Sequence, residues 1–328
     1  MKKICITGGT GFIGSHIVDY FKEKNENIEC ITRDKADLRN LSELKEAFKG
    51  AQCVIHNAAK ASDWGSYKDF YENNVIGTLN VMKACLHNNI KKIIMTGTCS
   101  VYGEENNLSI KDEESALNSH YPYFMDKVFP CRMNFYRDSK KEARGAAIAF
   151  AKKHNIDLTI LDPVWVFGER EFNTGFYEYL KTARMKIPFI MGSKKNKFHV
   201  IYARDLAKAY YLAYQKNLKG IHTFIIGREK ADYMDRIYTL FCKEAGFNKP
   251  KNICKLFVYP VGFFMEIGYT ILNIGKPPML TRGRVNMFYD NIEYNTDKAT
   301  KILKFKCDYS LEEAIKKTVN WYKREGFL

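Results

Sequence analysis

The feature that most constrains the fold is a glycine-rich turn near the start of the chain. The turn, Gly8-Gly9-Thr10-Gly11-Phe12-Ile13-Gly14, lies between a short apolar run at 4–6 and a helical pattern at 12–24. Glycines in this context let the backbone turn tightly and approach a pyrophosphate, which the N–H groups of the helix N-terminus can bind. A glycine pattern alone also fits an ordinary turn, but the strand–turn–helix context predicts a dinucleotide site. Its cofactor-binding candidates are Gly8, Gly11, Phe12, Ile13 and Gly14.

The length of the chain predicts two parts. At 328 residues it is too long for one small core, and a dinucleotide-binding part followed by a substrate-binding part is the arrangement we expect. We place the first part at 1–162 and the second at 163–328, and we expect that the chain can cross back to the first part around 198–228.

The cysteines and the N-terminus bear on compartment and metal binding. Nine cysteines are scattered along the chain, without a Cys-x-x-Cys pair or a His/Cys cluster at metal spacing. Those in expected buried strands, such as Cys5 and Cys53, are interpreted as reduced apolar residues of a cytoplasmic protein. We therefore expect no metal site, and no signal peptide before a first strand that starts at residue 2.

The chain is strongly basic, with a net charge of +15 from 52 basic and 37 acidic residues. Nucleic-acid binding would explain such a charge, but the basic residues form short patches such as Lys194-Lys195-Asn196-Lys197. No basic stripe with interleaved aromatic residues is present, so we expect a solvated surface and no nucleic-acid partner. A basic surface also attracts phosphorylated cofactors, anionic substrates and membranes.

The end of the second expected strand, at 28–32, bears on cofactor type. It is followed by Arg33-Asp34. An acidic side chain here accepts hydrogen bonds from a ribose 2′-OH, whereas an arginine accommodates a 2′-phosphate. Because Arg33 comes first, we favour NADP(H) over NAD(H). Asp37 and Leu38 are expected to pass beneath the adenine.

The next expected strand, 53–56, is a continuous apolar run suited to a parallel sheet covered on both faces. Small residues at its end leave room for a ligand at the sheet edge, so Ala58, Ala59 and Lys60 are further cofactor candidates. His56 is interpreted as a strand-end histidine bonded to backbone. A long helix is expected over 67–88 and another strand over 92–97.

With these motifs in view, the sequence resembles the extended short-chain dehydrogenase/reductase family, also called the NAD-dependent epimerase/dehydratase family. The resemblance covers essentially the whole chain. It rests on the glycine turn, His56-Asn57-Ala58-Ala59, Asn74-Val75-Ile76-Gly77-Thr78, Thr98 before Tyr102-Gly103, Tyr136-Arg137-Asp138-Ser139-Lys140, Asp162-Pro163-Val164-Trp165-Val166-Phe167-Gly168 and Asp205-Leu206-Ala207.

The resemblance implies an α/β fold of the Rossmann type, with a doubly wound parallel sheet and a smaller α/β C-terminal substrate domain. It also implies a Ser/Thr–Tyr–Lys catalytic group and a homodimer through two long helices. The positions that match the family's dinucleotide site are completed by Asn74, Pro163 and Val166. Asn74 is also expected to position a helix or a proton-relay water.

Two tyrosines have a lysine four residues later, Tyr123 with Lys127 and Tyr136 with Lys140. A free tyrosine ionises at a pH of about 10, so a catalytic tyrosine needs a cation that stabilises its phenolate, and that spacing on a helix supplies one. Pro130 would end a helix begun at Tyr123. We therefore select Tyr136 as acid/base and keep Tyr123 as the alternative. Lys140 would also bind the nicotinamide ribose, and Thr98 would hydrogen-bond the substrate oxygen.

The substrate half departs from the pattern of nucleotide-sugar members. Many of these have an arginine immediately before the proline at 163, where this chain has Asp162, and another near the position of Lys197. Lysine is the poorer bidentate partner of a diphosphate. Residues 58–65 and 277–282 look more like the 3β-hydroxysteroid dehydrogenase-like and 3-oxoacyl-lipid reductase branches.

The apolar stretch 256–274 supports that comparison. It contains a single charge, Glu266, so a membrane span is one interpretation. Pro260, Gly262, Gly268 and Glu266 argue against a span, and we favour a substrate-covering helix that can touch a membrane surface. Core packing explains the composition almost as well. The aromatic segment 104–135 is expected either to cover the site or to be a packed surface excursion.

We therefore predict an NAD(P)-dependent oxidoreductase acting on a secondary alcohol or ketone of a hydrophobic, lipid-like small molecule. A nucleotide-sugar epimerase, dehydratase or reductase is the first alternative. A non-catalytic nucleotide-sensing protein of the same fold is the second.

Overall fold

A six-stranded sheet organises the first half of the molecule. The computed structural model describes residues 3–103, 109–172 and 175–328. The strand order is β10-β5-β4-β3-β1-β2, and every neighbouring pair is parallel. The strands are β1 (Lys3–Thr7), β2 (Ile28–Ile31), β3 (Ala51–His56), β4 (Lys92–Thr96), β5 (Asp157–Pro163) and β10 (Ile221–Ile226). The predicted α/β doubly wound fold is confirmed.

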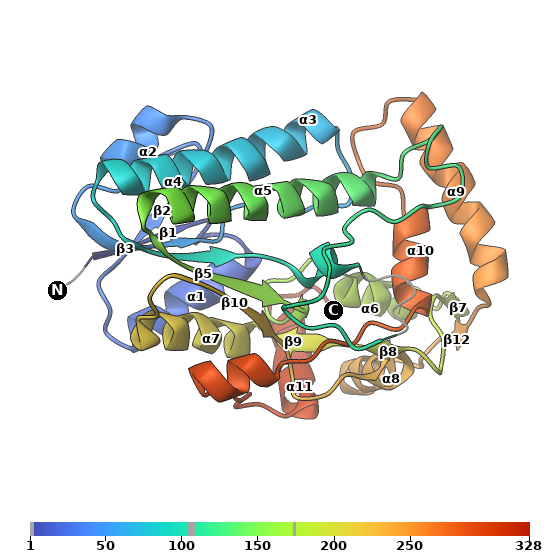
Figure 1. The fold of residues 1–328 in the computed structure, drawn as a ribbon. Helices are drawn as coiled ribbons and strands as arrows, with labels where there is room; N and C mark the ends of the chain where they lie inside the picture. Colours follow the sequence, from blue (N-terminus) through green and yellow to red (C-terminus); the bar gives the residue numbers. More distant parts are fainter. Residues whose placement is uncertain (1–2, 104–108, 173–174) are drawn as a thin grey trace.

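The central strands consist mainly of apolar residues because helices cover both faces of the sheet. Ile4 and Ile6 belong to one buried cluster, whereas Cys5 between them belongs to the other. Figure 1 shows α1 and α7 on one side of the sheet and α2, α4 and α5 on the other. The helices are α1 (Phe12–Glu23), α2 (Leu41–Ala47), α4 (Gly77–His87), α5 (Arg132–His154) and α7 (Ala203–Lys216).

The helix expected over 67–88 is interrupted by a π-helical segment. Helix α3 (Tyr67–Phe70) continues into η1 (Tyr71–Ile76), which continues into α4. A π segment inside a helix often marks a functional site. Here it contains Asn74, whose side chain is buried.

The second half is built from short strand pairs and helices. Its strands are β6 (Trp165–Phe167), β7 (Phe189–Ile190), β8 (Lys197–Phe198), β9 (Val200–Tyr202), β11 (Asp232–Tyr233) and β12 (Lys251–Asn252), paired as β6-β9, β7-β12 and β8-β11. Its helices are α6 (Phe176–Arg184), α8 (Met234–Ala245), α9 (Lys255–Ile271), α10 (Arg282–Tyr289), η3 (Ala299–Leu303) and α11 (Leu311–Arg324).

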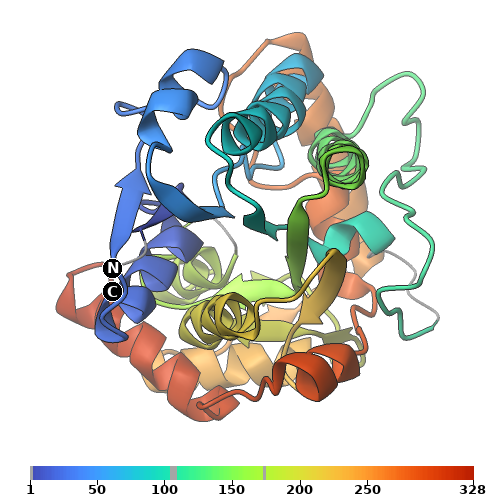
Figure 2. The same ribbon diagram turned by 60° about the vertical axis from the view of Figure 1, so that its left-hand side comes forward.

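The two halves of the chain share the sheet. After β9 and α7 the chain returns to it as β10, which pairs with β5 along its whole length. Figure 2 shows α7 and β10 beside the strands of the first half. The boundary that we predict between residues 162 and 163 falls inside β5 and stays a prediction.

Helix α9 lies at the end of the molecule farthest from β1 and β2 (Figure 1). Pro260 is inside it, and Glu266 is buried on it. Across residues 3–103, 109–172 and 175–328, none of the helices combines the length and apolar content that a transmembrane span requires.

Candidate active site

The glycine turn has the geometry that close approach of a phosphate requires. Gly8 has a φ of +69°, and the Gly11 N–H donates to the Gly8 carbonyl oxygen at 3.1 Å. A Cβ on Gly14 would lie 1.9 Å from the Gly8 oxygen, and a Cβ on Gly8 would lie 2.8 Å from the Ala58 backbone. Glycine is therefore required at both positions.

Helix α1 starts directly after this turn, with Gly11 as its N-cap. No side chain caps it, and its first turn contains no acidic residue. Phe12, Ile13 and Gly14 thus form an N-terminus suited to an anion, since its N–H groups and dipole carry partial positive charge.

Asp37 lies in an ion-pair cluster beyond the end of β2. The Arg39 guanidinium binds its carboxylate through two nitrogens, at 3.0 and 2.7 Å, and Arg33 Nε lies 3.3 Å away. Hydrogen bonding by Arg39 holds the pKa of Asp37 well below its usual range. Arg33 itself is largely exposed, with 76% of its side chain accessible.

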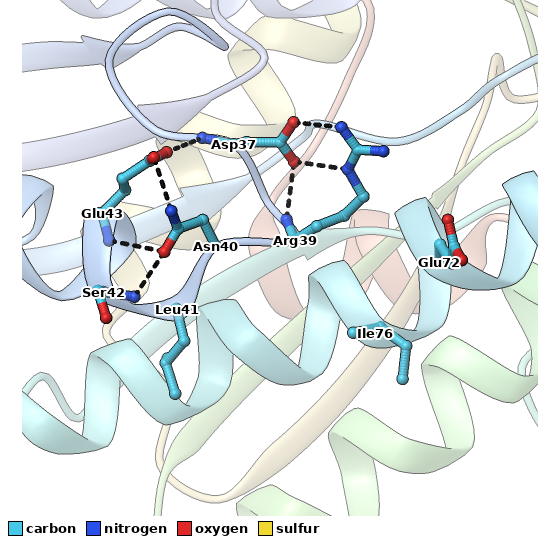
Figure 3. A pocket seen from close by; sticks show the side chains of 8 residues that line it. All are labelled: Asp37, Arg39, Asn40, Leu41, Ser42, Glu43, Glu72 and Ile76. Atoms are coloured by element: carbon cyan, nitrogen blue, oxygen red, sulfur yellow. Dashed lines mark hydrogen bonds and ion pairs between the residues drawn. The ribbon is translucent and has the colours of Figure 1, made fainter.

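Asp37 and Arg39 also line a cavity of about 640 Å³ between the start of α2 and η1. Figure 3 shows that Asn40 and Glu43 border it on one side and Glu72 and Ile76 on the other. Leu38 lies against α4, because a Cβ on Gly77 would be 3.0 Å from the Leu38 Cβ. Of the two residues predicted to pass beneath the adenine, Asp37 therefore lines this cavity and Leu38 packs against the start of α4.

Asn74 connects the loop after β3 to α5. Its Oδ1 accepts from the Lys60 N–H at 2.7 Å, and its Nδ2 donates to Ser139 Oγ at 2.9 Å. The Lys60 ammonium lies 3.4 Å from an Asp69 carboxylate oxygen. The structure thus brings the 58–60 loop and the helix containing Tyr136 into one hydrogen-bonded unit, which includes two of the candidate residues, Lys60 and Asn74.

His56 differs from the prediction that backbone groups satisfy it. Its two ring nitrogens lie 2.9 Å from Thr7 Oγ1 and 3.0 Å from Thr78 Oγ1. Burial lowers the pKa of His56 to about 3. The ring is neutral and connects β1, β3 and α4. The prediction of a backbone partner for His56 was wrong, because the two threonine hydroxyls are distant in sequence and come within reach only in the folded sheet.

The three predicted catalytic residues come from α5 and the end of β4. Tyr136 and Lys140 are one turn apart on α5, and Lys140 Nζ donates to the Thr96 carbonyl oxygen at 2.8 Å. Thr98 is the N-cap of η2 (Cys99–Tyr102), and its hydroxyl lies 3.0 Å from Ser100 Oγ. Burial lowers the pKa of Lys140 to about 8, against the opposing effect of the Asp162 charge. Tyr136 is half-buried, with its ring 6.4 Å from that of Phe70.

The alternative tyrosine has a different setting. Tyr123 and Lys127 precede α5 and are not helical. Tyr123 is buried, and its hydroxyl oxygen accepts from the buried Arg137 guanidinium at 3.1 Å.

Pro163 and Val166 lie at the edge of the sheet where β5 ends. Pro163 is the last residue of β5, and Val166 pairs with Ile201 in the β6-β9 ladder. Next to them is a residue that the sequence argument used only as a departure from a pattern. Asp162 is fully buried, and its carboxylate accepts from the Thr98 N–H at 3.0 Å. The signal that could have found it is a charged residue directly after the apolar pair Ile160-Leu161, near the end of a buried strand.

Comparison with known proteins assigns this chain to a family. The model of the family described as "NAD dependent epimerase/dehydratase family" matches residues 4–227. The 2-alkyl-3-oxoalkanoate reductase of Stenotrophomonas maltophilia is 24% identical over 335 residues, which cover 96% of this chain and 98% of that protein. A putative UDP-glucose 4-epimerase of Methanocaldococcus jannaschii is 27% identical, with 98% and 99% covered.

Dehydrogenases named for 3β-hydroxysteroids or sterol carboxylates match at similar identities. Among solved structures, MoeE5 in complex with UDP-glucose and NAD superimposes with a TM-score of 0.77 at 18% identity, covering 98% of this chain and 99% of that chain. The matched proteins include reductases, dehydrogenases and epimerases, so they leave the branch open. The chain belongs to the NAD-dependent epimerase/dehydratase family and is an NAD(P)-dependent enzyme, an oxidoreductase or epimerase with a Rossmann-type fold.

Proposed function

We propose that the protein is an oxidoreductase that interconverts a secondary alcohol and a ketone. The observation that carries this proposal is the position of Lys140. It lies one helical turn after Tyr136 and donates to the Thr96 carbonyl oxygen at 2.8 Å, two residues before Thr98. The hydroxyl of Thr98 comes from the segment after β4, and the phenol and the ammonium come from successive turns of α5, which supports a common site.

In the proposed reaction, Tyr136 exchanges a proton with the substrate oxygen. The Lys140 ammonium lowers the pKa of the phenol, and the Thr98 hydroxyl orients the same oxygen. When bound, the nicotinamide dinucleotide donates or accepts the hydride. Residues that would hold it are those of the glycine turn, Asp37, Leu38, Ala58, Ala59, Lys60, Asn74, Pro163 and Val166, with Lys140 at the nicotinamide ribose. The required glycines at 8 and 14 and the uncapped start of α1 support this assignment.

For the cofactor we propose NADP(H), with Arg33 as the partner of the 2′-phosphate. The exposed guanidinium at the end of β2 supports this proposal. Titration of the protein with NADPH and NADH is the test, with Arg33→Ser compared with Arg39→Ser. We expect that only Arg33→Ser removes a preference for NADPH. A clear preference of the unaltered protein for NADH would overturn the proposal.

For the substrate we propose a hydrophobic ketone or alcohol, as in the 3β-hydroxysteroid dehydrogenase-like branch. The two positions where nucleotide-sugar members have an arginine support this. Asp162 is a buried carboxylate, and the Lys197 ammonium is paired with Glu293 at 2.8 Å. Neither supplies an uncommitted guanidinium for a diphosphate.

A ligand screen tests the substrate class. Thermal unfolding is measured with NADPH present, once with UDP-, GDP- and dTDP-sugars and once with 2-alkyl-3-oxoalkanoic acids and 3-ketosteroids. The ligands that stabilise the protein are then assayed for NADPH oxidation. Stabilisation by a nucleotide diphosphate alone would favour the epimerase alternative. Catalytic inactivity towards every ligand that binds would favour the nucleotide-sensing alternative, against which the complete set Thr98, Tyr136 and Lys140 argues.

We also propose that α9 contacts an anionic membrane surface. Its outward residues are large, apolar and exposed, among them Leu256, Phe257 and Phe264 at 68–75% accessibility. The only acidic residue of 255–279, Glu266, is buried, whereas Lys276 is exposed. Vesicles of phosphatidylglycerol should therefore co-sediment the protein more than vesicles of phosphatidylcholine, and Phe257→Ser/Phe264→Ser should abolish the difference. Equal sedimentation with both lipids would contradict the proposal.

A homodimer is proposed on the family pattern, through the outer faces of the two long helical elements. The exposed rings of Tyr67 and Tyr71 beside α5 support this surface. Analytical ultracentrifugation tests it, and a monomer at micromolar concentration would contradict it.

A further inference from the structure

The carboxylate of Asp162 lies at the centre of a buried cluster beneath Thr98. Its Oδ1 accepts from the Thr98 N–H at 3.0 Å, and its Oδ2 accepts from the Tyr102 hydroxyl at 2.8 Å. The same Oδ2 forms an ion pair with Arg144 on α5. One side chain thus contacts both ends of the η2 turn and the helix that contains Tyr136 and Lys140.

The Asp162 carboxylate occupies the space beside Gly97, the residue that follows β4. A Cβ on Gly97 would lie 1.7 Å from Asp162 Oδ1, so any other residue at 97 would displace the carboxylate. The position of Arg144 is set as well, because its second terminal nitrogen donates to Thr223 Oγ1 on β10 at 3.3 Å. Gly97, Arg144 and Asp162 therefore fit together as a set.

Asp162 and Lys140 bind the same short segment at the end of β4. Lys140 Nζ donates to the Thr96 carbonyl oxygen at 2.8 Å, and the Asp162 carboxylate accepts from the Thr98 N–H at 3.0 Å. The Lys140 side chain is buried, which favours the neutral amine, and the negative charge of Asp162 opposes this effect. The other titratable neighbour across the sheet, His56 on β3, is neutral because burial lowers its pKa to about 3. Tyr136 lies one helical turn before Lys140 on α5 itself. Arg144 is engaged with Asp162 and lies on the far side of that carboxylate from the Thr98 N–H contact.

We propose that Asp162 is a positioning residue of this active site, which holds the Thr98 turn in place and supplies the negative charge that keeps the Lys140 ammonium protonated. The inference rests on the proposed roles of Thr98 and Lys140. It makes Asp162 part of the site without contact to substrate.

The test compares two substitutions of the same kind. Asp162→Asn removes the charge and keeps the shape. Asp205→Asn is the matched control, because Asp205 is also a buried carboxylate that accepts a backbone N–H, that of Asp308 at 2.7 Å, outside the site. Each full-length protein is isotope-labelled at the lysine ε carbons and titrated by NMR, and the Lys140 resonance is identified by its absence in Lys140→Met.

We expect the midpoint of the Lys140 titration to fall by about one pH unit in Asp162→Asn, because a nearby opposite charge is lost. Asp205→Asn should leave the midpoint unchanged. An unchanged midpoint in folded Asp162→Asn would overturn the proposal. If that variant does not fold because Arg144 is left unpaired, Asp162→Asn/Arg144→Met is titrated and compared with Arg144→Met, so that the two proteins differ only in the charge of Asp162. The midpoint should again be lower in the variant without that charge.

Activity supplies the second readout. With any ketone found in the ligand screen, Asp162→Asn should lower kcat by roughly 10- to 100-fold while the Kd of NADPH stays within about twofold, since misplacement of a catalytic group reduces rate rather than cofactor binding. The alkaline limb of the pH profile should move to lower pH together with the Lys140 midpoint. If no ketone or sugar is turned over, the proposed function fails, but the NMR titration still decides the role of Asp162.

Discussion

The sheet half and the C-terminal half of this molecule hold their shape in different ways. In the sheet, neighbouring strands are joined by parallel ladders with a register shift in β1 between Lys3 and Ile4, and successive residues of a strand enter opposite cores. The C-terminal half has strand pairs of two or three residues. There, order comes from side chains, such as the stacked rings of Phe176 and Phe241 and the buried ion pair of Glu266 with Arg282.

The difference shows where variation is tolerated. We expect dinucleotide binding to depend most strongly on backbone shape at a few glycines, with the proposed Arg33 contact deciding which dinucleotide is preferred. A substrate held by side chains can be exchanged for another by substitutions that leave the sheet intact. This is consistent with a family in which reductases of alkyl-oxoalkanoates and epimerases of nucleotide sugars share one architecture.

The largest expected effect tests whether the chemistry resides in the sheet half. Tyr136→Phe removes the proposed acid/base and should lower kcat by about 100-fold or more, because general acid–base catalysis contributes on the order of 10²–10⁴. The Kd of NADPH should be nearly unchanged. Tyr123→Phe is the matched control, and steady-state kinetics with isothermal titration measure both variants. Loss of turnover in Tyr123→Phe with survival in Tyr136→Phe would reverse the assignment.

Within the sheet half, the glycine turn has no room for a side chain at Gly14, whereas α5 has room for one at Gly145. Gly14→Ala places a methyl group 1.9 Å from the Gly8 oxygen, whereas a Cβ on Gly145, inside α5, meets nothing within 4 Å. We expect Gly14→Ala to abolish measurable NADPH binding. Gly145→Ala should stabilise the protein by ~0.5–1 kcal/mol, because alanine is the better helix former. Urea unfolding and cofactor titration measure these effects, and normal binding by Gly14→Ala would show that the turn does not cradle the phosphates.

Side-chain dependence of the C-terminal half is tested at Glu266. Its carboxylate binds Arg282 at 2.9 Å, and Arg282 also donates to the Phe124 and Phe129 carbonyl oxygens. Glu266→Gln leaves a buried guanidinium without its counter-ion and should cost ~3–5 kcal/mol of unfolding free energy. In the control, Glu178→Gln removes an exposed pair with Lys181 and should change that free energy by less than ~1 kcal/mol. Equal losses of unfolding free energy in Glu266→Gln and Glu178→Gln, measured by urea unfolding, would contradict the view that buried side-chain contacts hold the C-terminal half together.

The smallest effect concerns His120, which lies between Asp138 at 2.8 Å and Asp126 at 3.0 Å. Burial lowers its pKa, but the hydrogen bonds and charges of the two carboxylates outweigh burial, so the pKa is raised above 6.5. A raised pKa stabilises the fold fully below the unfolded value and loses that contribution as pH rises through the folded value. We expect faster limited proteolysis of the segment 119–131 above neutral pH than at about pH 6.

The matched variant for that experiment is His120→Asn, which cannot become charged. Its proteolysis rate should depend less on pH than that of the unaltered protein. The same pH dependence in both proteins would exclude His120 as the cause.

Local patterns were enough to predict the parts of the molecule built from local periodicity. The apolar run at 4–6, the glycine turn with the helical pattern after it, and the spacing of Tyr136 and Lys140 predicted β1, α1 and the helical setting of that pair in α5. Helix α11 is another element with a local signal, since it starts with a capping box of Ser310 and Glu313. Each of these depends on residues within one turn of one another.

Contacts between distant segments could not be predicted in this way. The threonine partners of His56 come from β1 and α4, and the space beside Gly97 is filled by a residue 65 positions later. The π segment at Tyr71–Ile76 departs from the helical period by one residue, which a hydrophobic pattern does not register. The roles assigned to Thr98, Tyr136 and Lys140 remain predictions.

The return of the chain as β10 has a consequence for synthesis and for engineering. Until residue 226 has left the ribosome, β5 has no partner on one side and presents an open row of backbone donors and acceptors. A truncated protein that ends near residue 162 would keep this edge of β5 unpaired and open to aggregation. Chimaeras that exchange substrate-binding regions between relatives should therefore retain the native 221–226 segment with the recipient's nucleotide-binding part.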